Sequence, residues 1–300
     1  MRNILRIIVS AAAITVIFYF LIKHLIVNWS QIPFAALHIE YLLLGVSIVP
    51  LVVNFLLYAL SWRYVVEVLD GKIGFRQAFW ILSSSQLAKY IPGGIWYTLG
   101  RAYLAKAEGY NEGIITVTVI IESIILLIIG FALVLVSIMF GGQVVKMQLK
   151  FFMPLLVILP FLYTPFLRYL VNLGLRLLKK RPLEFRFGVS SMVIYSLFFI
   201  LLWLAQSTGF CLFVNSIHPL GWPTSLKLVT VYILSWIVGY IAPFAPGGLG
   251  VREGVMALGL SSLMPSSLAV GVSFLARIWI TVFELVIFGA GLLIRPKKQL

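Results

Sequence analysis

Seven charged residues lie in or beside strongly apolar stretches of this chain, and they are the residues whose types could do chemistry. They are Lys89, Arg101, Glu122, Arg252, Glu253, Arg277 and Glu284. A charge inside a membrane is costly, so such residues usually pair with one another or mark a path for a substrate, an ion or a proton. The arginines could contact a phosphate, and the carboxylates could balance them or carry a coupling proton.

Internal ion pairs are the alternative use of these charges. Arg101 could pair with Glu122, and Arg252 could pair with Glu284. Arg277 could be only a structural cation, or one that extends its charge to the membrane surface. Pairing and function are compatible, because a pair can gate a cavity.

Two Pro-Gly-Gly triplets, at 92–94 and 246–248, interrupt apolar segments. Proline followed by two glycines breaks a helix, and interrupted helices are tolerated in a membrane where they line a cavity. The half-helix after each triplet directs free N–H groups toward the membrane centre, where they attract anions. The alternative is that these glycines only permit close helix crossing.

The triplets and their neighbouring charges therefore predict a substrate site without catalytic residues, cofactor or metal. The predicted substrate-binding residues are Lys89, Tyr90, Gly93, Gly94, Arg101, Gly247, Gly248 and Arg252. The predicted charge-balancing or coupling residues are Glu122, Glu253 and Glu284. The histidines are too widely spaced for a histidine-based metal site.

Aromatic residues gather around the first triplet. They are Trp80, Tyr90, Trp96, Tyr97 and Tyr103. Such residues typically mark the membrane interface, and the alternative is a cavity wall that grips a headgroup.

Composition indicates the elements that must position these residues. Hydrophobic residues make up 62% of the chain and charged residues 11%, and the mean hydropathy is +1.08. A soluble domain could not bury so much apolar surface, so we expect an all-α polytopic membrane protein. The net charge of +14 fits a positive-inside bias and anionic lipids rather than nucleic acid. Four runs contain no Asp, Glu, Lys or Arg: 41–62, 187–226, 228–251 and 254–276.

The apolar runs predict about six full transmembrane helices and two re-entrant broken-helix hairpins. Full spans are expected at about 7–27, 41–62, 113–140, 151–170, 188–214 and 266–294. The broken hairpins are expected at about 75–108 and 225–263. Basic residues precede the first span as in a signal peptide, but no convincing cleavage site follows, so we expect a retained helix.

Basic loops orient these elements, with both termini in the cytoplasm. Loops 63–76 and 171–187 and the C-terminus carry most of the loop cations, whereas Lys146 and Lys150 are exceptions. The two hairpins then enter from opposite sides, and the triplets lie about half a chain apart. We therefore expect one transmembrane domain, 1–300, built as an inverted repeat of 1–144 and 145–300. Chance recurrence of a glycine-rich triplet is the alternative.

Motifs for other functions are missing from the sequence. It contains no G-x-x-x-x-G-K-[ST] phosphate loop, no G-x-S-x-G elbow and no H-E-x-x-H zinc motif. No polar region is long enough for a soluble catalytic domain. We therefore expect a protein that is not an enzyme.

Two segments resemble a known family. They are Gln-Leu-Ala-Lys-Tyr-Ile-Pro-Gly-Gly at 86–94, followed by Gly100-Arg101, and Ala-Pro-Gly-Gly-Leu-Gly-Val-Arg-Glu-Gly at 245–254. Both resemble the transmembrane region of lysylphosphatidylglycerol synthases, a family of flippase-like membrane proteins, and the resemblance extends over nearly the whole chain. It implies a lipid-translocating fold. In full-length synthases a separate soluble domain makes the aminoacylated lipid, so a stand-alone member ending at Leu300 is not expected to have synthase activity.

We therefore expect a lipid translocase of the cytoplasmic (inner) membrane that moves an anionic or zwitterionic headgroup between leaflets. Its partners would be membrane lipids, either phospholipid or polyprenyl-phosphate-linked. One alternative is a scaffold that presents a lipid to a partner glycosyltransferase or lipid-modifying enzyme. Another is an intramembrane lipid-modifying enzyme that uses the glutamates as acid and base.

Overall fold

A computed structural model of the chain shows a helical protein. It describes residues 39–69, 71–90, 96–141, 169, 171–173, 176, 188–242 and 245–295. All regular elements in these ranges are helices, and no strand occurs among them. The expected span at about 7–27 lies outside the described residues, as does nearly all of the one at about 151–170.

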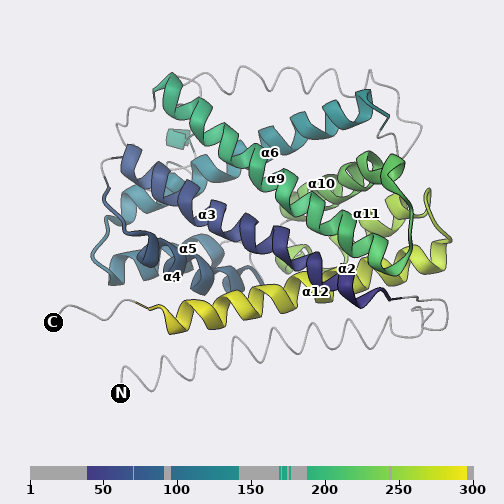
Figure 1. Cartoon of the computed structure of the whole chain (residues 1–300). Coiled ribbons are helices and arrows are strands. Elements are labelled where there is room, and N and C mark those ends of the chain that lie inside the picture. The colour runs from purple at the N-terminus through teal and green to yellow at the C-terminus, as the bar shows by residue number, and fades with distance from the viewer. Residues whose placement is uncertain are drawn as a thin grey trace.

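Long apolar helices form the body of the molecule (Figure 1). The described residues contain four stretches long and apolar enough to cross a membrane, each of 28 or 29 residues. At 1.5 Å per residue such a stretch is about 42 Å long, more than the roughly 30 Å of hydrocarbon. The chain is therefore a multi-pass membrane protein. The stretches are α2 with α3 (Tyr41–Val46, Ile48–Val68), α6 (Glu112–Met139), α9 (Val189–Ile217) and α12 (Ser266–Leu293).

These four stretches confirm the expected spans at about 113–140, 188–214 and 266–294, and the span that begins at 41 continues to Val68. Large apolar side chains on them face outward, including Leu56, Leu201 and Val286. In water such exposure would be unfavourable, whereas in a bilayer it places apolar surface against lipid tails.

Shorter helices occupy the two segments that carry the Pro-Gly-Gly triplets. The first contains α4 (Phe75–Gln86), the 3₁₀ helix η3 (Leu87–Tyr90) and α5 (Trp96–Ala107). The second contains α10 (Ser225–Ile241), the 3₁₀ helix η7 (Pro246–Gly248) and α11 (Val251–Leu260). None of these helices reaches the roughly 20 residues needed for a span. In Figure 1, α4 and α5 lie at the left end of the molecule and α10 and α11 toward the right.

Local sequence explains the start of α6 and the shape of the second break. The Asn111 side chain caps α6 by accepting a hydrogen bond of 2.8 Å from the Gly113 N–H, as short polar residues commonly do. The second break needs glycine, because Gly247, Gly248 and Gly250 have φ of 57°, 74° and 80°. These are left-handed conformations that strain residues with a Cβ.

Packing brings the helix η3, which precedes the first triplet, against η7, which contains the second. Helix α3 packs along α9, α10 lies against α6 and α11, and α12 crosses both α4 and α11. The 3₁₀ helices η3 and η7 contact each other. The core between the helices includes the fully buried Trp62, Phe199 and Phe210. The two interrupted segments therefore meet inside the bundle, although they lie far apart in the sequence.

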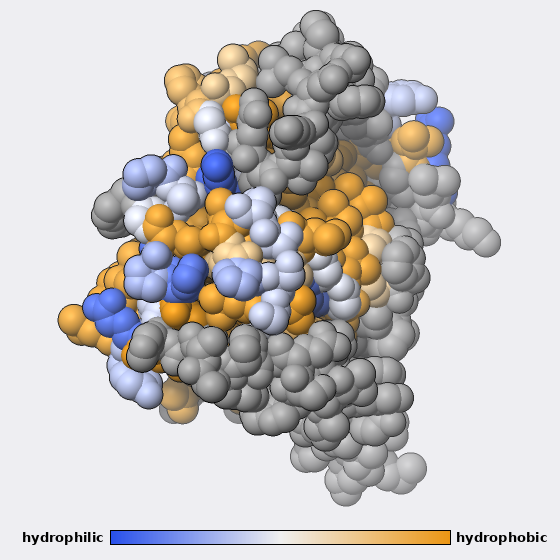
Figure 2. All heavy atoms as spheres, turned by 90° about the vertical axis from the view of Figure 1, so that its right-hand side faces the viewer, coloured by the Kyte–Doolittle hydropathy of each residue, from blue (hydrophilic) through white to orange (hydrophobic). Residues whose placement is uncertain are grey.

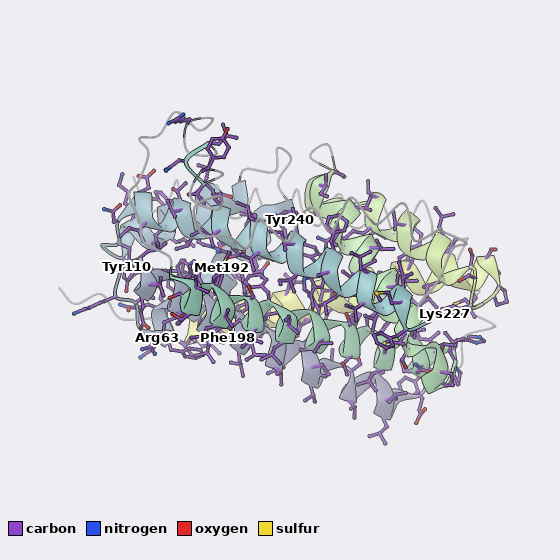
Figure 3. The ribbon with its side chains drawn as sticks, turned by 90° about the horizontal axis from the view of Figure 1, so that it is seen from above. Arg63, Tyr110, Met192, Phe198, Lys227 and Tyr240 are labelled. Carbon is purple, nitrogen blue, oxygen red and sulfur yellow. The ribbon has the colours of Figure 1, made fainter. Side chains whose placement is uncertain are left out.

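The ends of the bundle carry the polar connections. Arg63 and Tyr110 lie toward one end and Lys227 at the other, with Tyr240 between them (Figure 3). Arg76 donates to the carbonyl of Ile294, so the α3–α4 connection and the end of α12 share one end. Figure 2 looks onto the opposite end, where hydrophilic residues gather in the middle of the face among hydrophobic ones.

Candidate functional site

A cavity of about 440 Å³ lies among α3, α6, α9 and α10, and η3, α5, η7 and α11 also line it. Its lining combines charged, amide-bearing and aromatic side chains with the glycines of the second break. Tyr240, one of the lining residues, lies about midway between the ends of the bundle in Figure 3. Its chief polar and aromatic residues are Asn54, Tyr58, Gln86, Lys89, Tyr97, Glu122, Phe199, Trp203, Gln206, Trp236, Tyr240 and Arg252.

Each break contributes one cation to this cavity. Lys89 comes from η3 and Arg252 from the first turn of α11. The Lys89 ammonium forms an ion pair with Glu284 of α12. The Lys89 side chain is 22% exposed and that of Glu284 is 11% exposed. The sequence suggested Arg252 as the partner of Glu284, and the pair with Lys89 was missed.

Aromatic rings hold the Arg252 side of the cavity. The guanidinium carbon of Arg252 lies over the Trp236 ring, 4.6 Å from its centroid, a favourable cation–π arrangement. Trp236 stacks on Tyr240 with centroids 5.1 Å apart. Trp236 also meets Trp203 in an edge-to-face arrangement, with centroids 5.3 Å apart. The guanidinium therefore has a firm aromatic support.

Arg101 forms the expected pair with Glu122. Its Nη1 lies 2.5 Å from Glu122 Oε2, and Nη2 lies 3.2 Å from Oε1, which makes the contact bidentate. Nη2 also donates to the Tyr58 hydroxyl, and the guanidinium carbon is 4.6 Å from the Tyr97 ring centroid. Arg101 is 0% exposed and is not among the residues that line the cavity, whereas these three partners are.

A second buried pair holds the second break. Arg277 Nε lies 3.5 Å from Glu253 Oε1, with both side chains buried. Arg277 Nη2 also donates to the Gly247 carbonyl at 3.0 Å. Glu253 Oε2 accepts from the Gly250 N–H at 2.6 Å. Arg277 is thus a structural cation of the interior and does not extend to the surface.

Two amides of the second break have partners inside the turn. The Gly248 N–H donates to the Ala245 carbonyl at 2.8 Å, and the Gly250 N–H donates to the Glu253 carboxylate. The anion-attracting start of α11 is thus already capped by a carboxylate. These two amides of the second break are therefore not available to an anion without a rearrangement of the turn.

The other predicted residues have different outcomes. Tyr90 ends η3, and Gly93 and Gly94 lie outside the described residues. Gly247 and Gly248 line the cavity. Of the aromatic group around the first triplet, Tyr97 lines the cavity, Trp80 is buried, and Tyr103 is 56% exposed.

Several lining residues were not predicted from the sequence. Asn54 and Gln206 are polar residues inside apolar runs, and that signal could have identified them. The Asn54 amide donates to the Leu202 carbonyl at 2.7 Å, which joins α3 to α9. Tyr58 and Trp236 had no distinguishing signal, because aromatic residues are common throughout this chain.

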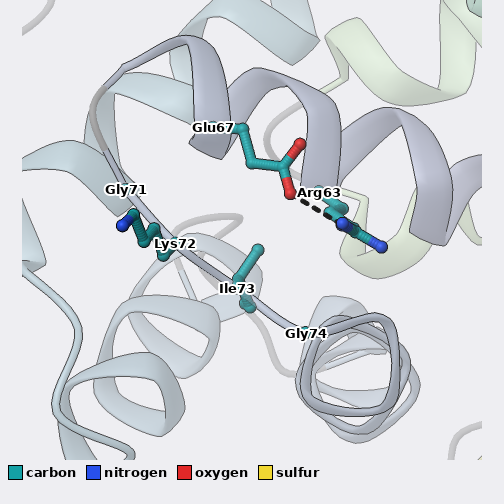
Figure 4. A pocket seen from close by; sticks show the side chains of 6 residues that line it. All are labelled: Arg63, Glu67, Gly71, Lys72, Ile73 and Gly74. Carbon is teal, nitrogen blue, oxygen red and sulfur yellow. Dashed lines mark hydrogen bonds and ion pairs between the residues drawn. The ribbon is translucent and has the colours of Figure 1, made fainter.

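A second hollow, of about 580 Å³, lies at the connection between α3 and α4 (Figure 4). Its lining includes Arg63 and Glu67, which form an exposed ion pair of 2.7 Å one turn apart on α3. It contains none of the buried charges, so the central cavity is the stronger candidate. Among the described residues, no group of three or more His, Cys, Asp or Glu could hold a metal ion.

Comparison with known proteins identifies the family. The model of the lysylphosphatidylglycerol synthase TM region matches residues 3–289, so the chain belongs to this family. No curated protein and no solved structure matches the chain.

Proposed function

From its membership of the lysylphosphatidylglycerol synthase TM-region family, we propose that the protein is a flippase-like lipid translocase. It moves an anionic or zwitterionic headgroup, of a phospholipid or a polyprenyl-phosphate-linked lipid, between the two leaflets. The observation that carries this proposal is the polar central cavity within an apolar helical body. The headgroup would enter the cavity while its tails stay in the surrounding lipid.

The balance of buried charge favours an anionic group. The interior set of charged residues described above contains one more cation than carboxylates. Its cations are Lys89, Arg101, Arg252 and Arg277, and its carboxylates are Glu122, Glu253 and Glu284. At low dielectric a net positive set attracts a phosphate more strongly than it would in water.

The cavity-lining cations have the most direct roles in this proposal. Lys89 and Arg252 contact the headgroup phosphate, which competes with Glu284 for Lys89. Glu284, once released, can accept a proton and so couple transport to proton movement. Arg101 acts indirectly, because it fixes Tyr58 and Glu122 at the cavity wall.

The order of helices supports an inverted repeat of 1–144 and 145–300 within one transmembrane domain. In the described part of each half a long helix is followed by two short helices and then by another long helix. The short pairs lie toward opposite ends in Figure 1. In such folds one half rocks against the other around a central site. The basic α3–α4 connection and the end of α12 would face the cytoplasm from the inner membrane.

Leaflet exchange in reconstituted vesicles tests the proposed function. Purified protein is placed in vesicles with fluorescent phosphatidylglycerol, phosphatidylcholine or a polyprenyl phosphate, and the outer-leaflet label is quenched at timed intervals. We expect faster exchange of at least one of these lipids than in protein-free vesicles. If none exchanges faster, while a glycosyltransferase copurifies with the protein, the lipid-presenting role replaces translocation.

A further inference from the structure

Two glycines from different elements make room for the side chain of Arg252. A Cβ on Gly239 of α10 would lie 2.2 Å from Arg252 Cγ and 2.9 Å from its Nε. A Cβ on Gly248 of η7 would lie 2.9 Å from both atoms. We call Gly239 and Gly248 the glycine notch. The stem of Arg252 passes through this notch before its guanidinium reaches Trp236.

Backbone conformation explains the glycine at 248 but not the one at 239. Gly248 has a φ of 74°, which alone favours glycine. Gly239 lies inside α10 and is not among the glycines with positive φ. A glycine within a helix is less stable than an alanine at the same position, so it needs another reason. The structural reason for glycine at 239 is therefore the space that Arg252 occupies.

The notch and Trp236 together restrict the guanidinium. Its carbon lies over the indole face, and Tyr240 stacks on the same indole. The N–H groups of a guanidinium lie in its plane and point outward from its edge. Those N–H groups match two oxygens of one phosphate, a contact that a lysine ammonium cannot reproduce.

We propose that the glycine notch and Trp236 are positioning residues that set Arg252 for bidentate contact with a phosphate group. The ligand class is a lipid whose headgroup carries phosphate, and lipids without phosphate are discriminated against. This inference rests on the proposed function only in taking the ligand to be a lipid headgroup.

The test compares binding of two lipids with the same acyl chains. Native mass spectrometry of the purified protein with phosphatidylglycerol and diacylglycerol measures the preference for phosphate. Loss of a charged hydrogen bond corresponds to about tenfold weaker binding. We expect Gly239→Ala and Arg252→Lys each to reduce the preference for phosphate about tenfold. Gly239→Ala displaces the guanidinium, and Arg252→Lys removes its pair of N–H donors.

Gly259→Ala is the matched control. Gly259 lies on α11, and its added Cβ would come 2.7 Å from Val231 Cγ2 on α10. The substitution disturbs the packing of the same two helices without meeting Arg252. We expect Gly259→Ala to lower the unfolding temperature and to keep the phosphate preference.

Three results would overturn the inference: equal binding of both lipids by the wild type, a retained preference in Gly239→Ala, or an equal loss in Gly259→Ala. These readouts do not depend on transport. Selective binding by a wild type that exchanges no lipid would overturn the proposed function and support the notch. Lipid exchange by a wild type without any phosphate preference would support the proposed function and overturn the inference about the notch.

Discussion

The two segments that carry the Pro-Gly-Gly triplets each have a buried ion pair, but the cation and the carboxylate exchange places between them. After the first break, Arg101 on the short helix α5 pairs with Glu122 on the long helix α6. After the second, Glu253 on α11 pairs with Arg277 on α12. In both places a buried ion pair joins the short helix that follows the break to the next long helix.

The surroundings of the two pairs differ. The first pair is bidentate and enclosed by Tyr58, Trp62 and Tyr97. The second is longer, at 3.5 Å, and its members also hold the backbone of the turn at Gly247 and Gly250. The comparison indicates that the first pair fixes α5 against α6, whereas the second maintains the turn itself.

Helix α12 connects the two regions. Arg277 holds the second break, and Glu284, two helical turns further on, pairs with Lys89 at the first. Residues seven apart lie on the same face of a helix. A shift of α12 would therefore move Arg277 and Glu284 together and change the contacts that they make at both breaks.

Removing Arg101 should have the largest effect on stability. Arg101→Ala leaves Glu122 buried without its cation, a change that costs about 3–5 kcal/mol in buried pairs. We expect a marked fall in the unfolding temperature of the detergent-solubilised protein, followed by fluorescence. Arg101→Met combined with Glu122→Gln should be less destabilised, because no charge is stranded. Equal losses in the single and double variants would contradict a structural ion pair.

Removing Arg277 should have a smaller and more local effect. Arg277→Ala loses a longer ion pair and the donor to the Gly247 carbonyl, and unmade buried hydrogen bonds cost about 1–3 kcal/mol each. We expect faster amide hydrogen exchange in 245–250, with little change in α5. Unchanged protection of 245–250 would show that Arg277 does not hold the turn.

Replacing Lys89 should reduce transport more than stability. Lys89 and Glu284 keep some contact with solvent in the cavity, so Lys89→Met should destabilise the fold by less than about 2 kcal/mol. Exchange of labelled phosphatidylglycerol in vesicles should slow severalfold, and Lys89→Arg should retain more of the rate. A full rate in Lys89→Met would remove Lys89 from the proposed site.

The exposed Arg63–Glu67 pair should matter least. Such pairs, one turn apart on a helix, contribute about 0.3–0.5 kcal/mol. We expect Arg63→Ala to leave both the unfolding temperature and the exchange rate within error of the wild type. A loss comparable to that of Lys89→Met would mean that the hollow in Figure 4 takes part in transport.

Sequence reasoning identified the long helices because an apolar run of sufficient length has few alternatives in a membrane. It also suggested the Arg101–Glu122 pair, whose members lie on neighbouring helices. It missed the Lys89–Glu284 pair, because that contact depends on how α12 crosses α4. Such crossings are set by packing among distant segments, which a single sequence does not show.

The role of the glycines was only partly predictable. Pro-Gly-Gly indicated a break, and the second one has the left-handed conformations that glycine allows. The prediction of free amides after each triplet is tested only at the second one, where Gly248 and Gly250 use their N–H groups locally. The need for glycine at 239 was invisible in sequence, since it arises from a side chain thirteen positions away in the chain.

Blocking the cavity chemically tests the central claim most directly. Ser123 lines the cavity and hydrogen-bonds Tyr240 at 2.6 Å. Ser123→Cys is made in a Cys211→Ala background and labelled with a bulky maleimide. The control is Glu67→Cys in the same background, which places the label in the second hollow. If the cavity carries the headgroup, labelling should stop most lipid exchange in Ser123→Cys and leave Glu67→Cys unchanged. Full exchange after complete labelling at residue 123 would contradict the account.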